Sequence, residues 1–254
     1  MRFRVLGCFG TIGNDHHTTS FLVDDDILID AGSGLGTLPL EALSKIDHVF
    51  LSHAHMDHIA LLPMLVDASL SQRGKPLVVH ASRSTLETLS DHVFNWKVYP
   101  DFRNIHSGDH PALEFSVMEP DVPLDIGGRQ ISAIPIVHSI PTVAFHIRGD
   151  EGSLVVSTDM TVSDEFWPVV NEIDDLRYLL IESAFQNARR DLCEASGHLC
   201  PSLLYGELQR LKRAARILIL HMKTSAESQI RKEIEEFADE FDIGFLAEGD
   251  ILTI

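Results

Sequence analysis

Short apolar runs and segments with a helical period alternate along the whole of this chain. Apolar runs bounded by polar or glycine turns are typical of buried strands, whereas longer segments with apolar residues three and four apart predict amphipathic helices. Strands are predicted at residues 3–9, 20–23, 27–29, 48–52, 77–80, 113–117, 130–137, 142–148, 153–157, 178–181 and 217–220, and helices at 38–45, 57–70, 84–93, 164–170, 201–211 and 225–237. This alternation favours an α/β protein.

No low-complexity stretch, charge block or proline-rich linker divides the chain. Its 254 residues, of which 44% are hydrophobic, suffice for one large α/β domain or two small ones. Because the alternation of elements continues without interruption, we expect a single domain over residues 1–254.

Polar residues that bind metals or move protons stand where several of the apolar strands end. They are Asp30, His53, His55, His138, Asp159, Glu182 and His221. In layered α/β proteins the strand ends meet the loops at one edge of a sheet, so side chains there can converge on one cleft. Any one of them is weak evidence, since an aspartate such as Asp30 also forms turns. Together they predict a functional site.

The densest group is the segment His53-Ala54-His55-Met56-Asp57-His58, at a predicted strand-to-helix junction. Three neutral imidazoles and a carboxylate suit zinc or a similar borderline cation. Residues two apart on an extended segment point the same way, so His53 and His55 can bind one ion together. Asp57 and His58 lie beyond the turn and can face a second ion, and Asp57 is also placed to cap the helix. The alternative is a polar loop that is rich in histidine without a chemical reason.

The net charge limits the kinds of binding partner to be expected, and the cysteine content indicates the cellular compartment. The formal net charge is -18 and the pI is near 5.0, so the chain should repel a long polyanion but could still capture a small anionic substrate through metal ions. Cys8, Cys193 and Cys200 form no CxxC pair and are expected to be free thiols in a reducing compartment. No apolar run reaches the roughly 18 residues of a membrane span, and no signal peptide is evident. We therefore expect a cytoplasmic protein with no membrane partner.

Other histidines and one long segment leave two interpretations open. His16 and His17 lie in a polar loop, where adjacent histidines are more often solvated than ligating. His80 and His92 lie in apolar surroundings and are expected in the core or at its rim. The aromatic-rich segment 95–111 either covers a site or is an ordinary connection pinned by its aromatic side chains.

The segment 50–58 resembles the HxHxDH signature of the metallo-β-lactamase-fold hydrolases. The resemblance continues in order through Asp30, His138, Asp159 and His221, and spans essentially the whole chain, from Ser20 to the C-terminus. It implies an αβ/βα four-layer sandwich with two divalent metal ions at one sheet edge, zinc being expected and manganese or iron(II) equally suited to the ligands. By this resemblance the first ion would be bound by His53, His55 and His138, and the second by Asp57, His58 and His221. Asp159 would bridge both ions, and Asp30 would hold a metal-bound histidine without binding an ion itself. Two such metal ions can hold a bridging hydroxide that acts as the nucleophile.

The C-terminal third narrows the resemblance to one branch of these hydrolases. Three segments are similar to segments of class II cyclic-nucleotide phosphodiesterases and of the related tRNA 3′-processing endoribonucleases. They are residues 181–185, Gly197-His198-Leu199 and His221-Met222-Lys223. The resemblance implies His198, Glu182 and Asp57 as catalytic residues, with His198 donating a proton to the leaving oxygen and Glu182 orienting it. The alternatives are a helix N-terminal residue for His198 and an ordinary strand-end carboxylate for Glu182.

The expected function is therefore a binuclear metal phosphodiesterase that opens 3′,5′-cyclic nucleotides to 5′-monophosphates. The first alternative is a tRNA 3′-processing endoribonuclease; the short segment between His138 and Asp159 leaves no room for the tRNA-gripping arm of that class, and the net charge opposes RNA. A thioester hydrolase of the glyoxalase type shares the metal motif but is not expected to have the Glu182–His198 pair. A redox protein or a catalytically silent scaffold on the same fold is the remaining class. The resemblance also suggests a homodimer.

Overall fold

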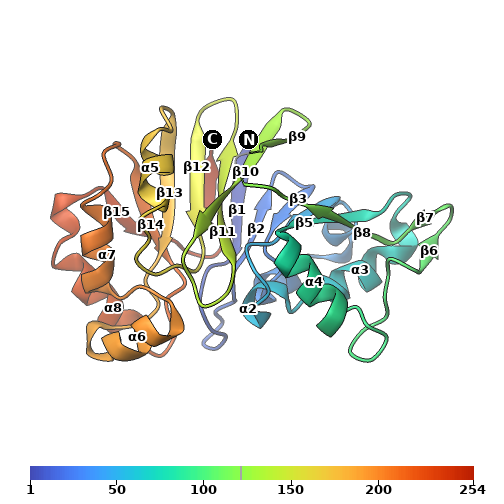
Figure 1. The fold of residues 1–254 in the computed structure, drawn as a ribbon, viewed down its shortest axis with the longest axis horizontal. Helices are drawn as coiled ribbons and strands as arrows, with labels where there is room; N and C mark the ends of the chain where they lie inside the picture. The colour runs from blue at the N-terminus through green and yellow to red at the C-terminus, as the bar shows by residue number, and fades with distance from the viewer. Residues whose placement is uncertain (121) are drawn as a thin grey trace.

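Two seven-stranded sheets form the centre of the molecule (Figure 1). The computed structural model describes residues 1–120 and 122–254. The first sheet has the order β16-β1-β2-β3-β4-β5-β8, with bounds Ile251–Thr253, Arg2–Gly7, Ser20–Val23, Ile27–Ile29, His48–Phe50, Leu77–Ala81 and Leu113–Val117. The second has the order β15-β14-β13-β12-β11-β10-β9, with bounds Ile243–Phe245, Arg216–Leu220, Leu176–Glu182, Ser153–Ser157, Thr142–Arg148, Arg129–Ile136 and Leu124–Ile126.

Alternation along the strands decides which side chains lie between the sheets. Phe21 and Val23 of β2 belong to a core cluster shared with the second sheet, whereas Leu22 between them belongs to a cluster on the opposite face. This is the period of two expected of a strand. Phe50 of β4 meets Phe145 of β11 edge to face, with ring centroids 6.0 Å apart, and so ties the two sheets together.

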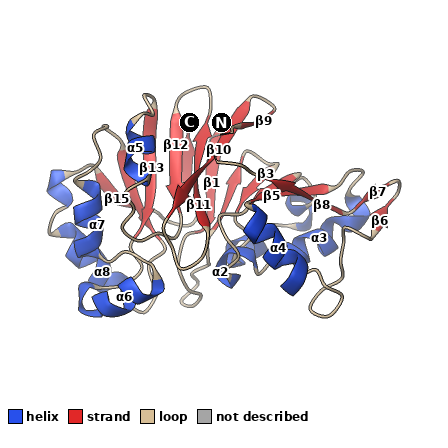
Figure 2. Ribbon diagram, in the orientation of Figure 1, coloured by secondary structure: helices blue, strands red, loops and turns tan. Residues whose placement is uncertain are grey.

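Helices cover the outer face of each sheet (Figure 2). On the first sheet lie α1, α2, α3 and α4, at Leu40–Leu43, Met56–Ile59, Leu62–Ser69 and Arg83–His92. The second sheet is covered by α5, α7 and α8, at Phe166–Asn171, Pro201–Leu208 and Glu227–Glu235, and the short α6 spans Arg190–Ser196. The four layers are those of the αβ/βα sandwich that the motif resemblance implied, so the predicted fold class is confirmed.

Parallel strands bring the predicted functional residues to one edge. In the first sheet β3, β4 and β5 run parallel, and in the second β12, β13 and β14 do so. The carboxyl ends of parallel neighbours meet at the same edge of a sheet. The polar residues that follow β3, β4, β12, β13 and β14 therefore gather where the two sheets approach each other.

One predicted helix is broken, and the predicted cap is wrong. Residues 57–70 were expected to form a single helix capped by Asp57, but α2 ends at Ile59 and α3 begins at Leu62. Pro63 explains the break, because its ring has no N–H to donate and would clash with the Ile59 carbonyl of a continuous helix. Asp57 lies inside α2 rather than before it, and the N-cap position is His55.

Two other segments contain elements that the pattern did not predict. The polar stretch before Gly197 holds α6, which ends in a left-handed Gly197 with φ of 74°. Segment 95–111 holds the small hairpin of β6 (His106–Ser107) and β7 (His110–Pro111). Within the described ranges, none of the helices has the length and apolar character needed to cross a bilayer.

Candidate metal centre

Seven predicted ligands come from four separate stretches of chain that meet at the common sheet edge. His53 and His55 follow β4 and Asp57 and His58 lie on α2, whereas His138, Asp159 and His221 follow β10, β12 and β14. Their nitrogen and carboxylate oxygen atoms form two groups in which all atoms lie within 4.8 Å of one another: His53, His55, His138 and Asp159, and Asp57, His58, Asp159 and His221. We call these the first and second clusters.

The first cluster is a set of three imidazole nitrogens facing one carboxylate oxygen. His55 Nδ1 lies 3.0 Å from His53 Nε2 and 3.2 Å from His138 Nε2. Asp159 Oδ2 lies 3.7 Å from both His53 Nε2 and His138 Nε2. Four donor atoms converging at these distances surround a space of the size that one tetrahedral cation occupies.

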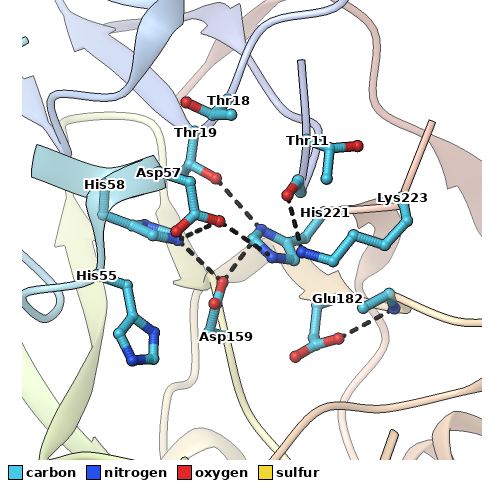
Figure 3. Close-up of polar contacts among 12 residues, drawn as sticks. Thr11, Thr18, Thr19, His55, Asp57, His58, Asp159, Glu182, His221 and Lys223 are labelled. Atoms are coloured by element: carbon cyan, nitrogen blue, oxygen red, sulfur yellow. Dashed lines mark hydrogen bonds and ion pairs between the residues drawn. The ribbon is translucent and has the colours of Figure 1, made fainter. Parts of the chain in front are cut away.

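The second cluster uses the other oxygen of Asp159. Asp159 Oδ1 lies 3.2 Å from His58 Nε2 and 3.1 Å from His221 Nδ1, while Asp57 Oδ2 lies 3.8 Å from the Nε2 atoms of both histidines (Figure 3). Asp159 is 1% exposed, so its carboxylate is presented to the two clusters and not to solvent. One buried carboxylate with an oxygen toward each group is the arrangement that a bridging ligand requires.

Hydrogen bonds behind the clusters fix the orientation of three imidazoles. Asp30 Oδ2 accepts from His58 Nδ1 at 2.7 Å and from the Ser52 hydroxyl at 2.9 Å. Ser52 Oγ lies 2.9 Å from His53 Nδ1, so a chain of bonds runs from His53 through Ser52 to Asp30. On the other side, His138 Nδ1 donates to the Gly197 carbonyl at 2.7 Å. Such outer partners set the tautomer and direction of ligating histidines.

Close backbone packing also holds the site in place. Asp30 and His221 adopt positive φ angles of 56° and 62°, which non-glycine residues rarely do. Gly10 lies directly against His221, because a Cβ atom built on Gly10 would come within 2.8 Å of His221 Nε2. The strained turn and the glycine contact together leave the His221 imidazole one position.

Burial and nearby charge set the protonation of these groups. Burial lowers the pKa of His53 and of His221 well below the usual range, and also lowers the pKa of His55 and His138, so all four are neutral. For His58 burial acts in the same direction, but the carboxylates of Asp159 and Asp30 outweigh it and raise its pKa. Neutral imidazole is the ligating form, and a cation can take the place of the proton on His58.

The described residues fit a bound metal because they leave buried polar atoms without partners. His58 Nε2, His221 Nε2 and Asp159 Oδ1 are all buried and accept or donate no hydrogen bond. A buried polar group without a partner costs about 1–3 kcal/mol, so three within the second cluster demand an explanation. A divalent cation between them provides one.

Glu182 and His198 form a second buried pair at the border of the clusters. His198 Nδ1 lies 2.7 Å from Glu182 Oε1, and Glu182 also accepts from the backbone N–H groups of Met160, Ala184 and Leu199 at 2.9, 3.1 and 3.2 Å. The His198 ring lies 5.0 Å from the His138 ring and 5.3 Å from the His221 ring. Burial opposes a charge on His198, but the Glu182 carboxylate outweighs it and raises the pKa of His198. His198 lies before α7, not on it, because the N-cap of that helix is Cys200.

The other histidines and the cysteines lie outside the two clusters. His16 Nε2 bonds to Glu227 at 3.1 Å and His17 Nδ1 to Glu248 at 2.8 Å. His80 is buried and lies 3.0 Å from His48, in line with the expectation of a core position. Cys8, Cys193 and Cys200 are free thiols, and the described residues place neither Cys193 nor Cys200 in a metal-ligating group.

Segment 95–111 is anchored as a connection and lies beside the metal-binding loop. Phe102 is buried and packs against Phe94, which anchors the segment as an ordinary connection. Val98 and Tyr99 line an apolar cavity of about 250 Å³ together with Met56, which stands between the ligand candidates His55 and Asp57. The segment thus reaches the outer side of the metal-binding loop.

Ser52, Thr19 and the Gly197 carbonyl were not expected as supporting groups. Ser52 directly precedes His53 at the end of a buried strand, and this position could have indicated a supporting role for its hydroxyl. Thr19 Oγ1 lies 3.4 Å from His221 Nδ1, although 202 residues separate them in sequence. Nothing local in the sequence marks Thr19 or Gly197 for these contacts.

Comparison with known families agrees with the geometry. A family model described as a beta-lactamase superfamily domain matches residues 25–222, which include both clusters. The chain belongs to the metallo-β-lactamase superfamily. A relative from Bacillus subtilis named a probable metallo-hydrolase, YhfI, is 27% identical over 98% of this chain and all of its own length. This membership places the chain in a family of metal-dependent hydrolases.

Two further relatives carry more specific names. A probable 3′,5′-cyclic-nucleotide phosphodiesterase of Yersinia pestis is 25% identical over 71% of this chain and 58% of its own length. A ribonuclease Z of Halorubrum lacusprofundi is 28% identical over 59% of this chain and 48% of its own. Among solved structures, unliganded yeast PDE1 is similar to this chain with a TM-score of 0.83 and 18% sequence identity. The superposition covers 100% of this chain and 99% of the yeast chain. That likeness concerns the fold alone.

Proposed function

We propose that this protein is a phosphodiesterase with two divalent metal ions, zinc in each site, and that it opens 3′,5′-cyclic nucleotides to 5′-monophosphates. The observation that carries the proposal is the sharing of Asp159, one oxygen of which faces each cluster. Ions held 3.5–4 Å apart suit in-line attack on a phosphoryl centre. The name of the Yersinia pestis relative supports the cyclic substrate.

The first ion would be held by His53, His55 and His138, the second by Asp57, His58 and His221, and both by Asp159. When bound, divalent ions supply a nucleophilic water at neutral pH and neutralise charge on the phosphoryl oxygens. The protein provides fixed imidazole directions and a buried carboxylate. Asp57 is more exposed to solvent than Asp30 and Asp159, so it lies where the substrate would enter.

His198 is proposed to protonate the alkoxide that leaves. The leaving oxygen of a natural phosphodiester is a poor leaving group and requires a general acid. His198 binds Glu182 through Nδ1, so Nε2 remains for the substrate. Because the Glu182 carboxylate raises the pKa of His198, the imidazole carries the proton to be donated. Glu182 orients this acid through Nδ1 and is itself held by three backbone N–H groups.

The similarity to ribonuclease Z makes RNA the second candidate substrate. The net charge of -18 argues against it, because a long polyanion would be repelled outside a local cationic region. Between His138 and Asp159 the chain forms only β11 and β12, with no separate arm that could hold a tRNA. A small anionic nucleotide suits both features better.

A hydrolysis panel with the metal-reconstituted protein tests this proposal. It sets cyclic AMP and cyclic GMP against a precursor tRNA, bis(4-nitrophenyl) phosphate and a glutathione thioester. We expect the cyclic nucleotides to be hydrolysed with release of 5′-monophosphates. Cleavage of the tRNA precursor with no turnover of cyclic nucleotides would replace the proposal by its alternative, and activity on the thioester alone would refute the phosphodiesterase class.

A single variant tests the general acid separately. His198→Ala should leave bound metal unchanged and slow hydrolysis of a cyclic nucleotide by roughly 10²–10⁴-fold. The aryl phosphodiester, whose leaving group needs no protonation, should lose much less. Equal losses on both substrates would remove His198 from this role.

A further inference from the structure

A cleft of about 360 Å³ lies next to the candidate metal centre, on the side of His198. We call it the Lys223 cleft. Its lining includes Thr11, Phe185, Arg189, Leu192, Lys223 and Ala226. The cleft is notable in a chain of net charge -18 because two cationic side chains face it. Neither the cleft nor these two residues have a part in the chemistry described above.

Phe185 connects the cleft to the proposed proton donor. Its ring lies 5.8 Å from the His198 ring and 5.9 Å from Lys223 Nζ. Lys223 Nζ donates to the Gly10 carbonyl at 2.8 Å, and Gly10 is the residue packed against His221. Lys223 thus lies two residues from His221, and both side chains contact Gly10. The side chain of Lys223 also lines the cleft.

The two cations have no carboxylate partner within the described part of the chain. The neighbouring Arg190 pairs with Glu194 at 2.8 Å, whereas Arg189 forms no such pair. Two carboxylates on α8 bond to other groups: Glu227 to His16 and Arg231, and Glu233 to the Asn187 N–H and to Gln229. The positive charge of the cleft is therefore available to a ligand.

The backbone adds to this preference for an anion. Ser225 and Ala226 line the cleft and stand at the start of α8, whose N-cap Ala226 has no side chain that could cap the helix. The free N–H groups and the dipole of a helix N-terminus favour negative charge. Two cations without a carboxylate partner beside this terminus are suited to a phosphate, which accepts charge-assisted hydrogen bonds from lysine and arginine.

The direction of the proposed reaction decides which part of the substrate reaches the cleft. The leaving oxygen must lie within reach of His198 Nε2. Phe185 lines the cleft and its ring lies 5.8 Å from the His198 ring, so a leaving alcohol that extends toward Phe185 reaches the cleft. We propose that the Lys223 cleft binds a second phosphate carried by the leaving alcohol, so that the preferred substrate is a nucleotide with a phosphate beyond the scissile diester. This inference rests on the proposed phosphodiesterase function and narrows its substrate class.

In the corresponding reaction water attacks phosphorus, the bond from phosphorus to the 3′-oxygen breaks, and the proton from His198 goes to that oxygen. A dinucleotide with a 5′-phosphate, pApA, then yields two molecules of AMP, and the unphosphorylated ApA yields adenosine and AMP. The two probes differ only in the phosphate on the leaving nucleoside, which makes them a matched pair.

The experiment measures kcat/KM of the metal-loaded protein for pApA and for ApA and compares their ratio between variants. We expect wild type to prefer pApA by roughly 10- to 100-fold, the contribution of one or two charge-assisted hydrogen bonds. Arg189→Gln and Lys223→Met should bring the ratio toward one, and Lys223→Arg should restore part of it. Lys232→Met, an exposed lysine on α8 away from the cleft lining, should keep the wild-type ratio.

The ratio is insensitive to a general loss of active protein, and Arg189 has no side-chain bond in the described residues whose removal would disturb the fold. A wild-type ratio near one, or a preference that survives in Arg189→Gln and Lys223→Met, overturns the inference. So does a protein that hydrolyses bis(4-nitrophenyl) phosphate but neither dinucleotide. Inactivity on all phosphodiesters, cyclic AMP included, would instead overturn the proposed function itself.

Discussion

The pairing of Glu182 with His198 leads to a quantitative prediction for Glu182→Gln. Glu182 is fully buried and accepts four hydrogen bonds, two on each oxygen. Glutamine retains one carbonyl oxygen, so two of these donors would face an amide NH2 group. Bonds to a charged group contribute about 1.5–3 kcal/mol each, and the variant should lose about 2–4 kcal/mol of unfolding free energy.

The same substitution should change the pH dependence of catalysis. The Glu182 carboxylate raises the pKa of His198, so the loss of that charge and its hydrogen bond should lower the pKa of His198. A general acid must carry its proton, so kcat/KM falls as pH rises through the pKa of His198, which Glu182 raises above the usual value of 6.5. The alkaline limb of the profile should therefore move to lower pH in Glu182→Gln.

The assay is the pH profile of kcat/KM for a cyclic nucleotide, measured beside metal content and Tm. Glu207→Gln is the matched control, because Glu207 is also buried and accepts from the Trp167 indole N–H at 2.7 Å, away from the clusters. It should lose similar stability and keep the alkaline limb in place. An unmoved limb in Glu182→Gln with normal metal content would refute the acid pair, and equal shifts in both variants would show that the effect is not specific.

Two further predictions concern the support of the clusters. Gly10→Ala places a methyl group within 2.8 Å of His221, so bound metal should fall, whereas Gly206→Ala, with open space at that position, should retain it; equal metal content in the two variants would contradict the role of the Gly10 contact. Asp30→Asn removes the charge that holds His58 through a 2.7 Å bond, and should weaken metal affinity by roughly 10–100-fold in a chelator competition; an unchanged affinity would show that Asp30 serves the fold alone.

The elements that could be predicted from the sequence are those whose signal is local. Strands such as Leu113–Val117, Thr142–Arg148 and Ser153–Ser157 were predicted at their observed bounds, because an apolar run between turns is a property of neighbouring residues. The spacing of His53 and His55 is likewise local, and their atoms do meet. The break before α3 could also have been predicted, since Pro63 cannot continue a helix.

Contacts between distant segments could not be predicted in this way. His138 donates to a carbonyl 59 residues away, and Lys223 to one 213 residues away. Neither Gly197 nor Gly10 differs locally from a turn glycine. The short α6 escaped prediction because most of its side chains are exposed and only Cys193 is buried, so its sequence lacks an apolar period. Its C-terminal Gly197 was the one usable signal.

If the buried carboxylate of Asp159 joins two metal sites, the metal stoichiometry of the protein must depend on it. After reconstitution with zinc and removal of free ion, mass spectrometry should find two equivalents per chain in the wild type. In Asp159→Ala it should find less than one, together with loss of phosphodiesterase activity, because both sites lose a ligand. A single equivalent in an active wild type, or two equivalents retained in Asp159→Ala, would contradict the account.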